Sequence, residues 1–490
     1  MQVLKRKMSD IEIRIIDTCT LNVEADEGIL KELHEFYTFE VPGYEYMPKF
    51  QSGLWDGKIR CFNMWKRQLP AGLLIKTLIW AKKNKYSVAL EPELLPVKIP
   101  DEEFNELYED LKLPEQFTKE DHQTYLIKKG LELKRALLLS PTGSGKSLII
   151  YALCKMIMRE TGKKALIVTP GINLVSQIPA EFKDYGYKKE INKFSETKDK
   201  NSSAEIYIST YHSLYKLPKK FFDQFGIIIA DEAHEYTAKT TQELISKTGG
   251  IAYKFGTTAT LQDTKCHSLV LEGMFGVPIS RTTTKKLIDA GKLAKAKIIA
   301  LVLNHPEEVC KRIKNENSYR AEIEEIITSN KRNDFLVNFI SKVPKNALVL
   351  FTHTAHGTYL RDKLKKSTKR PIYYIDGGVK ADLREEIRLK LEIDDDAIIL
   401  AQIRTAGTGW SVKNLHNVFF IHPSKQKNRI LQAIGRILRK LAGKNEARVW
   451  DIADNMSYKK HKNTTLEHFL FRLEAYSAEE HPVIFKEIKL

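Results

Sequence analysis

The sequence is poor in cysteine and has no long apolar run. Its five cysteines are odd in number and far apart, with no Cys-x-x-Cys pair, so neither a disulfide framework nor a zinc site is indicated. No apolar run approaches the roughly 18 residues that a membrane span requires. The basic start leads into a polar alternation rather than the apolar core of a signal peptide. We therefore expect a soluble cytoplasmic protein with reduced thiols and no membrane partner.

Positive charge exceeds negative charge in this chain. The 79 Lys and Arg residues stand against 62 Asp and Glu residues, which gives a formal net charge of +17. Such an excess favours a polyanionic partner such as nucleic acid, although a surface that only confers solubility has the same composition. Apolar residues make up 42% of the 490 residues, enough for well-formed cores in about three domains of ordinary size.

The stretch 135–147 combines an apolar run, a loop with two glycines and the start of an apolar helix. The run 136–139 predicts a buried strand, and the apolar spacing of 148–157 predicts a helix. Backbone N–H groups and the helix dipole between them form a phosphate cradle. Ser140 replaces the first Gly of the general phosphate-loop pattern, so the match is to a Pro-Thr-Gly-Ser-Gly-Lys-Ser variant. The residues predicted to hold a nucleoside triphosphate are Thr142, Gly143, Ser144, Gly145, Lys146 and Ser147, with Ser147 as a ligand of Mg²⁺.

An acidic motif, Asp231-Glu-Ala-His234, directly follows the apolar strand 227–230. Its carboxylates are expected at the carboxyl end of a strand, where ligands bind in open α/β sheets. Asp231 can hold the Mg²⁺ of the nucleotide, and Glu232 can orient and deprotonate the attacking water. The motif therefore predicts hydrolysis of the bound nucleotide.

Near the other end of the chain, 432–439 follows a helical pattern. Arg436 and Arg439 are three residues apart and are expected on one helical face. Two guanidinium groups on one face can reach the charge that develops on a transferred phosphoryl group. Taken alone, the motif also fits a solvated helix face.

Strands that alternate with helical stretches predict two parallel, doubly wound sheets. After the strand 136–139, the first set continues with 164–170, 204–210, 226–231 and 253–260. The second set, which lacks a phosphate loop, comprises 347–353, 371–376, 397–401, 417–422 and 447–451. The predicted domains are a small α+β domain at 1–100, α/β domains at 101–285 and 286–462, and a helical tail at 463–490.

The first 100 residues have a mixed pattern, with a strand at 11–15, helices at 27–36 and 73–83, and a hairpin that turns at 55–57. Basic groups are interleaved with aromatic ones, which is typical of a nucleic-acid surface that stacks bases. The alternative is that the aromatics fill a small core beneath solvated lysines. The candidates for nucleic-acid contact in this domain are Trp55, Lys58 and Arg60.

Taken together, the motifs resemble those of superfamily 2 helicases and translocases with a DEAH-type box, over about 117–455. The matching segments are motif I at Lys146 and Ser147, motif Ia at Thr169 and Pro170, motif II at 231–234, motif III at 258–260, motif V at 406–409 and motif VI at 432–439. The resemblance implies ATP as the nucleotide. It also implies two tandem RecA-like parallel-sheet motor domains behind the small α+β domain.

The resemblance also implies roles for single residues. It implies an adenine-reading role for Gln123 and catalytic roles for Lys146, Asp231, Glu232, Gln432, Arg436 and Arg439. Coupling of hydrolysis to movement would involve His234, Thr258, Thr260, Gly407, Thr408 and Gly409. Nucleic acid would be contacted near Thr169, Thr210 and His353.

Two departures from the family pattern limit this transfer. Trp410 and Ser411 occupy motif V positions where an aliphatic residue and an Asp are usual, so they receive no role. The residues before Gln123 also differ from the usual context, which leaves Phe117 and His122 as candidates for stacking on adenine.

A closer resemblance, over nearly the whole chain, is to the recombination-repair DNA helicases of T-even-type phages. The stretches 55–57, 411–416 and 435–440 carry it. It implies unwinding or branch migration of branched DNA (Holliday junctions, stalled forks and R-loops, hence RNA–DNA hybrids). We expect a monomer, and a host cytoplasmic location if a phage encodes the protein. Two alternatives remain open. One is an RNA helicase or a duplex DNA translocase of the restriction or remodelling type, and the other is a non-enzymatic annealing or scaffolding protein.

Overall fold

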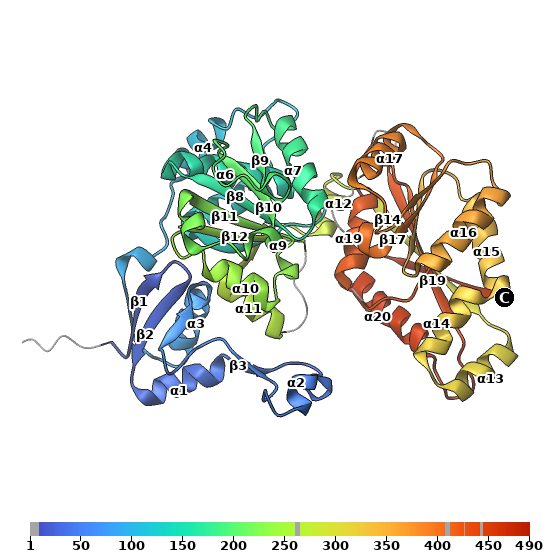
Figure 1. Cartoon of the computed structure of the whole chain (residues 1–490), viewed down its shortest axis with the longest axis horizontal. Coiled ribbons are helices and arrows are strands. Elements are labelled where there is room, and N and C mark those ends of the chain that lie inside the picture. The colour runs from blue at the N-terminus through green and yellow to red at the C-terminus, as the bar shows by residue number, and fades with distance from the viewer. Residues whose placement is uncertain (1–8, 260–264, 407–411, 426, 442–443) are drawn as a thin grey trace, which may run out of the picture. The chain divides into compact units, whose positions relative to one another are not determined.

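Two seven-stranded, all-parallel sheets form the framework of the computed structural model (Figure 1), which confirms the predicted fold class. The structure describes residues 9–259, 265–406, 412–425, 427–441 and 444–490. These residues belong to two compact units. The first comprises Met1–Pro141 and Gly145–Arg281, and the second comprises Thr282–Leu490 together with Thr142–Ser144. Within the described ranges, no helix is both long and apolar enough to cross a membrane.

The first unit begins with a small α+β domain whose four-stranded sheet has the order β5-β2-β1-β6. Alternate apolar residues of β1 and β2 point to one face, where they pack against two helices. The elements of this layer are β1 (Ile11–Asp17), β2 (Thr20–Ala25), α1 (Glu27–Phe36), β5 (Gln68–Pro70), α3 (Leu74–Lys83) and β6 (Val88–Leu90). A separate two-stranded sheet pairs β3 (Thr38–Glu40) with β4 (Lys58–Arg60).

The prediction of a hairpin that turns at 55–57 is wrong. β4 pairs with β3, and the residues expected to form the first arm of the hairpin include helix α2 (Pro48–Gln51). Pro48 occupies the first helical position, where its fixed φ favours a helix and its missing N–H costs nothing. Gly57 still turns the chain, with φ of +79°, and a Cβ there would lie 2.4 Å from the Tyr44 ring.

The larger sheet of the first unit has the order β13-β7-β12-β11-β8-β10-β9. Its strands are β7 (Arg135–Leu139), β8 (Lys164–Thr169), β9 (Ile191–Lys193), β10 (Ile206–Thr210), β11 (Phe225–Asp231), β12 (Tyr253–Thr258) and β13 (Pro278–Ser280). The helices around it are α4 (Asp101–Glu109), α5 (Asp121–Leu133), α6 (Lys146–Thr161), α7 (Ile172–Asp184), α8 (Phe194–Thr197), α9 (Tyr211–Leu214), α10 (Lys239–Ser246) and α11 (Lys265–Phe275).

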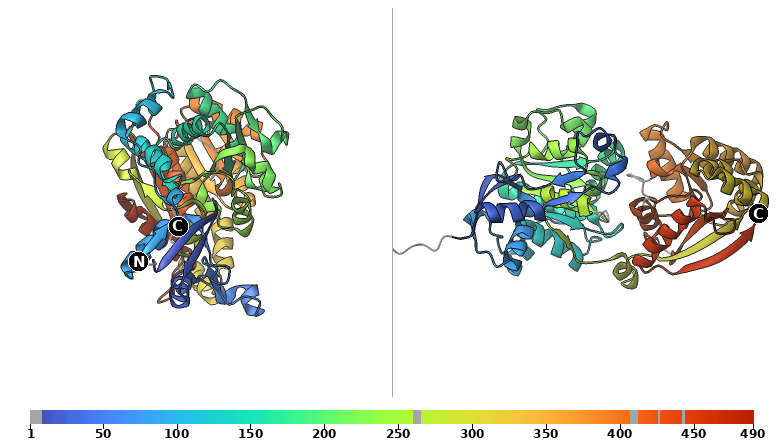
Figure 2. Two further views of the ribbon diagram at one scale, coloured as in Figure 1. Left: turned by 90° about the vertical axis from the view of Figure 1, so that its left-hand side faces the viewer. Right: turned by 90° about the horizontal axis from the view of Figure 1, so that it is seen from below.

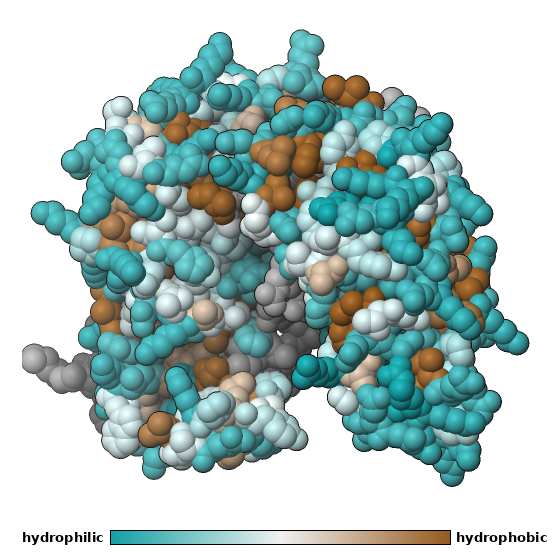
Figure 3. All heavy atoms as spheres, turned by 45° about the vertical axis from the view of Figure 1, so that its right-hand side comes forward, coloured by the Kyte–Doolittle hydropathy of each residue, from teal (hydrophilic) through white to brown (hydrophobic). Residues whose placement is uncertain are grey.

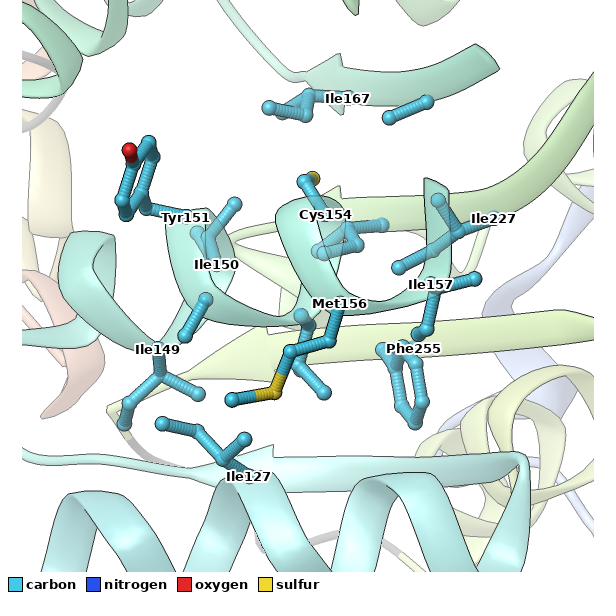
Figure 4. Packing of buried hydrophobic residues seen from close by; sticks show 14 of the residues in the cluster. Ile127, Ile149, Ile150, Tyr151, Cys154, Met156, Ile157, Ile167, Ile227 and Phe255 are labelled. Carbon is cyan, nitrogen blue, oxygen red and sulfur yellow. The ribbon is translucent and has the colours of Figure 1, made fainter. Parts of the chain in front are cut away.

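Continuous apolar runs form these strands because a parallel sheet is covered on both faces. Successive residues of one strand enter different cores: Leu138 packs on one side of the sheet and Leu137 on the other. Helix α6 fills the first of these cores, where its apolar side chains lie between the sheet and α5 (Figure 4). The helix that begins at Lys146 is therefore firmly anchored.

The sheet of the second unit has the order β16-β17-β15-β18-β19-β14-β20. Its strands are β14 (Lys295–Asn304), β15 (Ala347–Phe351), β16 (Ile372–Ile375), β17 (Ile398–Gln402), β18 (Asn417–Phe420), β19 (Glu446–Asn455) and β20 (Val483–Lys489). Helices cover both of its faces (Figure 2). They are α12 (Thr284–Asp289), α13 (Glu307–Glu316), α14 (Tyr319–Thr328), α15 (Asn330–Lys342), α16 (Thr354–Ser367), α17 (Ala381–Ile393), α18 (Ile403–Ala406), α19 (Lys427–Ile437) and α20 (Thr464–Ala478).

The prediction of a purely helical tail from 463 is wrong. Helix α20 is followed by β20, which pairs in parallel with β14 and completes the sheet at its edge. The amphipathic pattern of the helix is local, whereas an edge strand is specified by its distant partner and carries exposed apolar residues such as Phe485.

On the face of the molecule shown in Figure 3, hydrophilic side chains predominate and apolar ones lie in small groups.

Candidate nucleotide and nucleic-acid sites

The loop after β7 turns through two glycines in the left-handed region, Gly143 and Gly145, each with φ of +84°. Glycine adopts this conformation without a steric penalty. Gly145 also lies against Gln123 of α5, because a Cβ at this position would come 2.2 Å from Gln123 Nε2. Helix α6 begins at the next residue, Lys146, so its first N–H groups and the positive end of its dipole adjoin the loop.

Lys146 lies between the two carboxylates of the acidic motif. Its Nζ is 2.8 Å from Asp231 Oδ1 and 2.6 Å from Glu232 Oε1. Burial opposes the charge on Lys146, but the two carboxylates outweigh this effect and raise its pKa above the ordinary value. The structure thus brings the phosphate-loop lysine and the Asp-Glu pair together at the carboxyl edge of the sheet. The lysine is held in its charged form, which suits binding of phosphate.

Asp231 and Glu232 are held differently. Asp231 ends β11, is only 4% exposed, and accepts a hydrogen bond from the hydroxyl of Thr257 on the adjacent strand β12 at 2.8 Å. Glu232 follows in the left-handed region with φ of +51°, which is uncommon for a residue with a Cβ. Such backbone conformations cluster at functional sites, where the surrounding structure offsets their cost.

His234 connects the acidic motif to the end of β12. Its Nδ1 lies 3.0 Å from Thr258 Oγ1 and 3.5 Å from Glu232 Oε2. The Thr258 carbonyl accepts a hydrogen bond from the backbone N–H of Ser140, just ahead of the phosphate loop, at 3.0 Å. Motifs I, II and III are therefore joined by hydrogen bonds. Four residues predicted to couple hydrolysis to movement lie outside the described residues: Thr260, Gly407, Thr408 and Gly409.

Ser147 Oγ lies 2.9 Å from the hydroxyl of Tyr185, which directly follows α7. Sequence reasoning missed Tyr185, because nothing in its local pattern links it to the phosphate loop. The ring of Phe117, a candidate for adenine stacking, packs edge-on against Tyr185 with centroids 4.8 Å apart. His122, the other candidate, is buried.

The oxygen donors fit a magnesium ion that accompanies a nucleotide. Such an ion is bound through one or two protein oxygens plus phosphates and waters, rather than by an all-protein cage. The Ser147 hydroxyl and the Asp231 carboxylate supply donors of this kind. The described residues contain no group of three or more His, Cys, Asp or Glu side chains that could hold a metal ion.

The prediction that Arg436 and Arg439 share a helical face is wrong. Helix α19 carries the buried Gln432 and the partly exposed Arg436, but it ends at Ile437. Arg439 lies beyond it and forms an antiparallel bridge with Leu293, next to a hydrogen bond from Ala294 N–H to the Leu438 carbonyl at 2.8 Å. This tertiary pairing takes the backbone out of the helix.

The candidate nucleic-acid segments lie at the carboxyl ends of strands. Thr169 and Thr210 are register partners at the ends of β8 and β10. The Thr169 hydroxyl is buried and bonds the Gly171 carbonyl at 3.1 Å, so contact here is limited to backbone groups. His353 follows β15 in the second unit, is exposed, and occupies the N-cap position of α16 without a capping hydrogen bond from its side chain.

The three candidates in the N-terminal domain are more constrained than expected. Trp55 is half-buried and donates from Nε1 to the Lys58 carbonyl at 2.8 Å. Lys58 lies 3.7 Å from Glu40, and Arg60 pairs with Asp56. These ion pairs are exposed and therefore weak, so phosphate groups can compete for the cations.

Some aromatic residues of the N-terminal domain fill its small core, whereas others are exposed and available for stacking on bases. Phe62 is fully buried in the small core, whereas Trp65 is 91% exposed. Trp65 belongs to the run of interleaved aromatic and basic residues but was not among the predicted nucleic-acid contacts. Only the tertiary structure distinguishes these two residues, because both belong to the same aromatic and basic run.

Three family models match the chain in order. They are the N-terminal domain of the DNA helicase UvsW over 10–91, the res subunit of type III restriction enzymes over 115–263, and the helicase conserved C-terminal domain over 331–440. The chain therefore carries the paired domains of the superfamily 2 helicases. A likeness to a fragment of a putative type I restriction HsdR subunit from Vibrio vulnificus, with a TM-score of 0.58 at 18% identity, covers 80% of this chain and 74% of that one and extends to the fold alone.

The chain is 31% identical to the ATP-dependent DNA helicase uvsW of Enterobacteria phage T4, over 98% of this chain and 100% of that protein. The crystal structure of T4 UvsW matches with a TM-score of 0.52 at 30% identity and covers 98% of this chain and 99% of its own. The chain belongs to the UvsW helicase family. It is also 23% identical to the DNA 3'-5' translocase XPB2 of Sulfurisphaera tokodaii, over 65% of this chain and 78% of that protein.

Proposed function

We propose that this protein is an ATP-dependent DNA helicase that unwinds or branch-migrates branched DNA, such as Holliday junctions, stalled forks and R-loops. The observation that carries the proposal is the position of Lys146, within 2.8 Å of Asp231 and 2.6 Å of Glu232 at the carboxyl edge of a parallel sheet. The relative that matches over 98% of this chain is named an ATP-dependent DNA helicase, which supports ATP as the nucleotide and DNA as the nucleic acid.

Phosphate oxygens of ATP would compete with the two carboxylates for Lys146. Once Glu232 gives up this ion pair, its carboxylate can orient and deprotonate the attacking water. Mg²⁺, when bound with ATP, would neutralise phosphate charge beside Ser147 and Asp231. Gln123 is proposed to recognise the adenine base, because it already adjoins the phosphate loop at Gly145.

Arg436 and Arg439 are the guanidinium groups that we assign to the developing phosphoryl charge. A guanidinium supplied in cis stabilises such charge strongly in other nucleotide hydrolases. The assignment does not require a shared helical face, because each side chain can act separately. His234 and Thr258 are proposed to couple hydrolysis to movement.

The basic surplus of the chain suits contact with DNA phosphates. Binding should therefore weaken steeply with salt and depend little on sequence. Backbone groups near Thr169 and Thr210, the exposed His353, and the Trp55, Lys58 and Arg60 region are the proposed contacts. RNA–DNA hybrids are proposed as further substrates, with the protein acting as a monomer in the host cytoplasm.

A duplex DNA translocase is the second candidate. The match to the res subunit of type III restriction enzymes over 115–263, and the likeness to a protein named as a DNA 3'-5' translocase, favour it. A translocase moves along duplex DNA without separating its strands. Displacement of a third strand from a triplex therefore distinguishes it from a helicase.

The test uses a labelled four-way DNA junction, a tailed DNA duplex, a matching RNA duplex and a triplex. Wild-type protein is compared with Lys146→Ala and with Lys163→Ala, which alters an exposed lysine just beyond α6. We expect ATP-dependent dissociation of the junction by the wild type and Lys163→Ala, and none by Lys146→Ala, which should still bind DNA. Junction dissociation by Lys146→Ala would overturn the site, and triplex displacement alone would favour the translocase.

A further inference from the structure

The turn between β1 and β2 is hydrogen-bonded to the larger sheet of the same unit. The backbone N–H of Thr18 donates to the Gly249 carbonyl at 3.1 Å. The Thr18 hydroxyl lies 3.0 Å from that carbonyl and 2.7 Å from the carbonyl of Ile251. A single side chain of the N-terminal domain thus engages the backbone that leads into β12.

Two cationic side chains depend on Thr18. Lys254 is fully buried, and its Nζ lies 2.5 Å from Thr18 Oγ1 and also donates to the Ile251 carbonyl. Arg135 donates to the Thr18 carbonyl. Arg135 Nη1 is buried and has no hydrogen-bond partner among the described residues. Loss of the Thr18 hydroxyl would therefore remove one of the two acceptors that the structure describes for the buried Lys254 amine, which is costly.

A second contact fixes the same domain at another point. Gly72, just ahead of α3, packs so closely on α11 that a Cβ would lie 2.0 Å from the Glu272 carbonyl oxygen. Beside it, Lys76 Nζ lies 2.7 Å from the Glu272 carboxylate. The N-terminal domain is therefore attached at two separate places to the larger sheet and its helices, within the same compact unit.

The partners of Thr18 lie at informative positions in the sheet. Arg135 is the first residue of β7, whose other end leads into the phosphate loop. Lys254 is near the start of β12, whose last residue, Thr258, bonds His234. Each of these strands spans about 16 to 20 Å and is nearly inextensible. The Thr18 contact therefore lies at the amino ends of the two strands whose carboxyl ends carry the nucleotide loop and the partner of His234.

We propose that Thr18 is a positioning residue that fixes the N-terminal domain to the first motor domain, so that branched DNA held by this domain moves with the nucleotide-binding sheet. The coupling rests on the proposed helicase function. Without this attachment the motor would still hydrolyse ATP on DNA, but each hydrolysed ATP would move the branch point less.

The test replaces Thr18 with Val, which keeps the shape and removes the hydroxyl, and with Ser as the matched control that retains it. Hydrogen exchange at 249–254 should rise by about 5- to 30-fold in Thr18→Val, as expected when a buried donor loses its acceptor. ATPase stimulation by single-stranded DNA should stay near the wild-type value. Four-way junctions resolved per ATP hydrolysed should fall about fivefold or more.

A double variant and an independent variant make the test decisive. Lys254→Met combined with Thr18→Val removes the buried amine that has lost the Thr18 acceptor, so it should restore both slow exchange and junctions per ATP. Gly72→Ala should loosen the domain from the other contact and also lower junctions per ATP, even if Thr18→Val does not fold.

The outcomes separate the two proposals. Faster exchange in Thr18→Val or Gly72→Ala with unchanged junctions per ATP would overturn the coupling and leave the helicase function standing. Equal loss of ATPase on every nucleic acid would also overturn it, because it would indicate general destabilisation. A wild-type ATPase that no DNA stimulates would overturn the proposed function itself, and the coupling with it.

Discussion

Thr257 and Asp231 are joined across neighbouring strands by a hydrogen bond of 2.8 Å from Oγ1 to Oδ1. The same carboxylate oxygen lies 2.8 Å from Lys146 Nζ, so one donor orients the carboxylate and the other neutralises it. Thr257 is fully buried on β12. Among the contacts that the structure describes, its side chain makes none with the phosphate loop. We expect this hydrogen bond to fix the carboxylate that is proposed to bind Mg²⁺.

Thr257→Val should lower ATP hydrolysis by about 10- to 100-fold, the usual cost of removing a group that orients a metal ligand. The apparent Mg²⁺ requirement should rise with it, because the carboxylate loses its orientation. Steady-state ATPase at several Mg²⁺ concentrations measures both effects. Thr257→Ser keeps the hydroxyl and should stay close to wild type. Equal losses in both variants would argue for a packing defect instead.

His234→Ala should separate hydrolysis from strand separation. The imidazole bonds Thr258 at 3.0 Å, so its removal breaks the link from the acidic motif to the end of β12 while Asp231 and Glu232 remain. We expect DNA-stimulated ATPase to persist and junctions resolved per ATP to fall about 5- to 100-fold, the range of typical coupling energies. Thr258→Val should behave similarly and Thr258→Ser should not. A proportional fall of both activities in His234→Ala would contradict the coupling role.

Asp454→Asn should destabilise the second unit strongly. Asp454 is buried on β19 and accepts from Arg332 Nε at 2.7 Å and from Arg332 Nη2 at 2.9 Å. Burial opposes the charge of this carboxyl, but Arg332 and His305 outweigh it and hold its pKa well below the usual range. Breaking a buried pair costs about 3–5 kcal/mol of unfolding free energy. Urea denaturation checks this.

A matched control for that variant is Asp334→Asn. Asp334 lies 3.5 Å from Lys363, with both side chains about half-exposed, so its loss should cost at most about 1 kcal/mol. The stabilisation from Asp454 should also disappear in acid, because a depressed carboxyl pKa contributes stability above the unfolded-state pKa that is lost as pH falls. Similar unfolding free energies for the two variants would show that Arg332 is not anchored by Asp454.

Lys254→Met should remove a pH dependence of stability. Burial lowers the pKa of Lys254 from an ordinary value of 10.5 to about 7, although Asp17 and Cys19 raise it and Arg135 lowers it further. At pH values between these two pKa values, the unfolded chain binds more protons at this site than the native protein does. The free energy of unfolding therefore rises with pH across this window, by an amount on the order of a few kcal/mol, and is flat below it.

Denaturation of wild type and Lys254→Met at pH 7, 8, 9 and 10 measures that contribution as the difference between their slopes. Lys163→Met, which alters an exposed lysine, should retain the wild-type slope. Identical slopes for wild type and Lys254→Met would mean that the buried amine titrates as in the unfolded chain.

Local sequence patterns were sufficient for several parts of the protein. The phosphate loop is specified by consecutive residues, because Gly143 and Gly145 supply the turn and Lys146 starts the helix. Asp231 was placed correctly at a strand end, since an apolar run ahead of it was enough to predict β11. Fold class followed for the same reason: a parallel sheet buried on both faces leaves continuous apolar runs in the sequence.

The errors arose where a distant partner determines the local structure. Arg439 continues a helical pattern in sequence, but the bridge to Leu293 ends the helix first. The expected hairpin at 55–57 failed because β4 pairs with β3 across an intervening helix. β20 was assigned to a helical tail because its partner, β14, begins far earlier in the chain.

The sequence by itself therefore determined the nucleotide chemistry and the parallel-sheet class of this protein, because both are specified by spacings of a few residues. Only the tertiary structure decided which basic and aromatic groups of the N-terminal domain are exposed and how that domain is attached. Thr18 and Lys254 are 236 positions apart. Their contact depends on the packing of two separate sheets, which no local periodicity specifies.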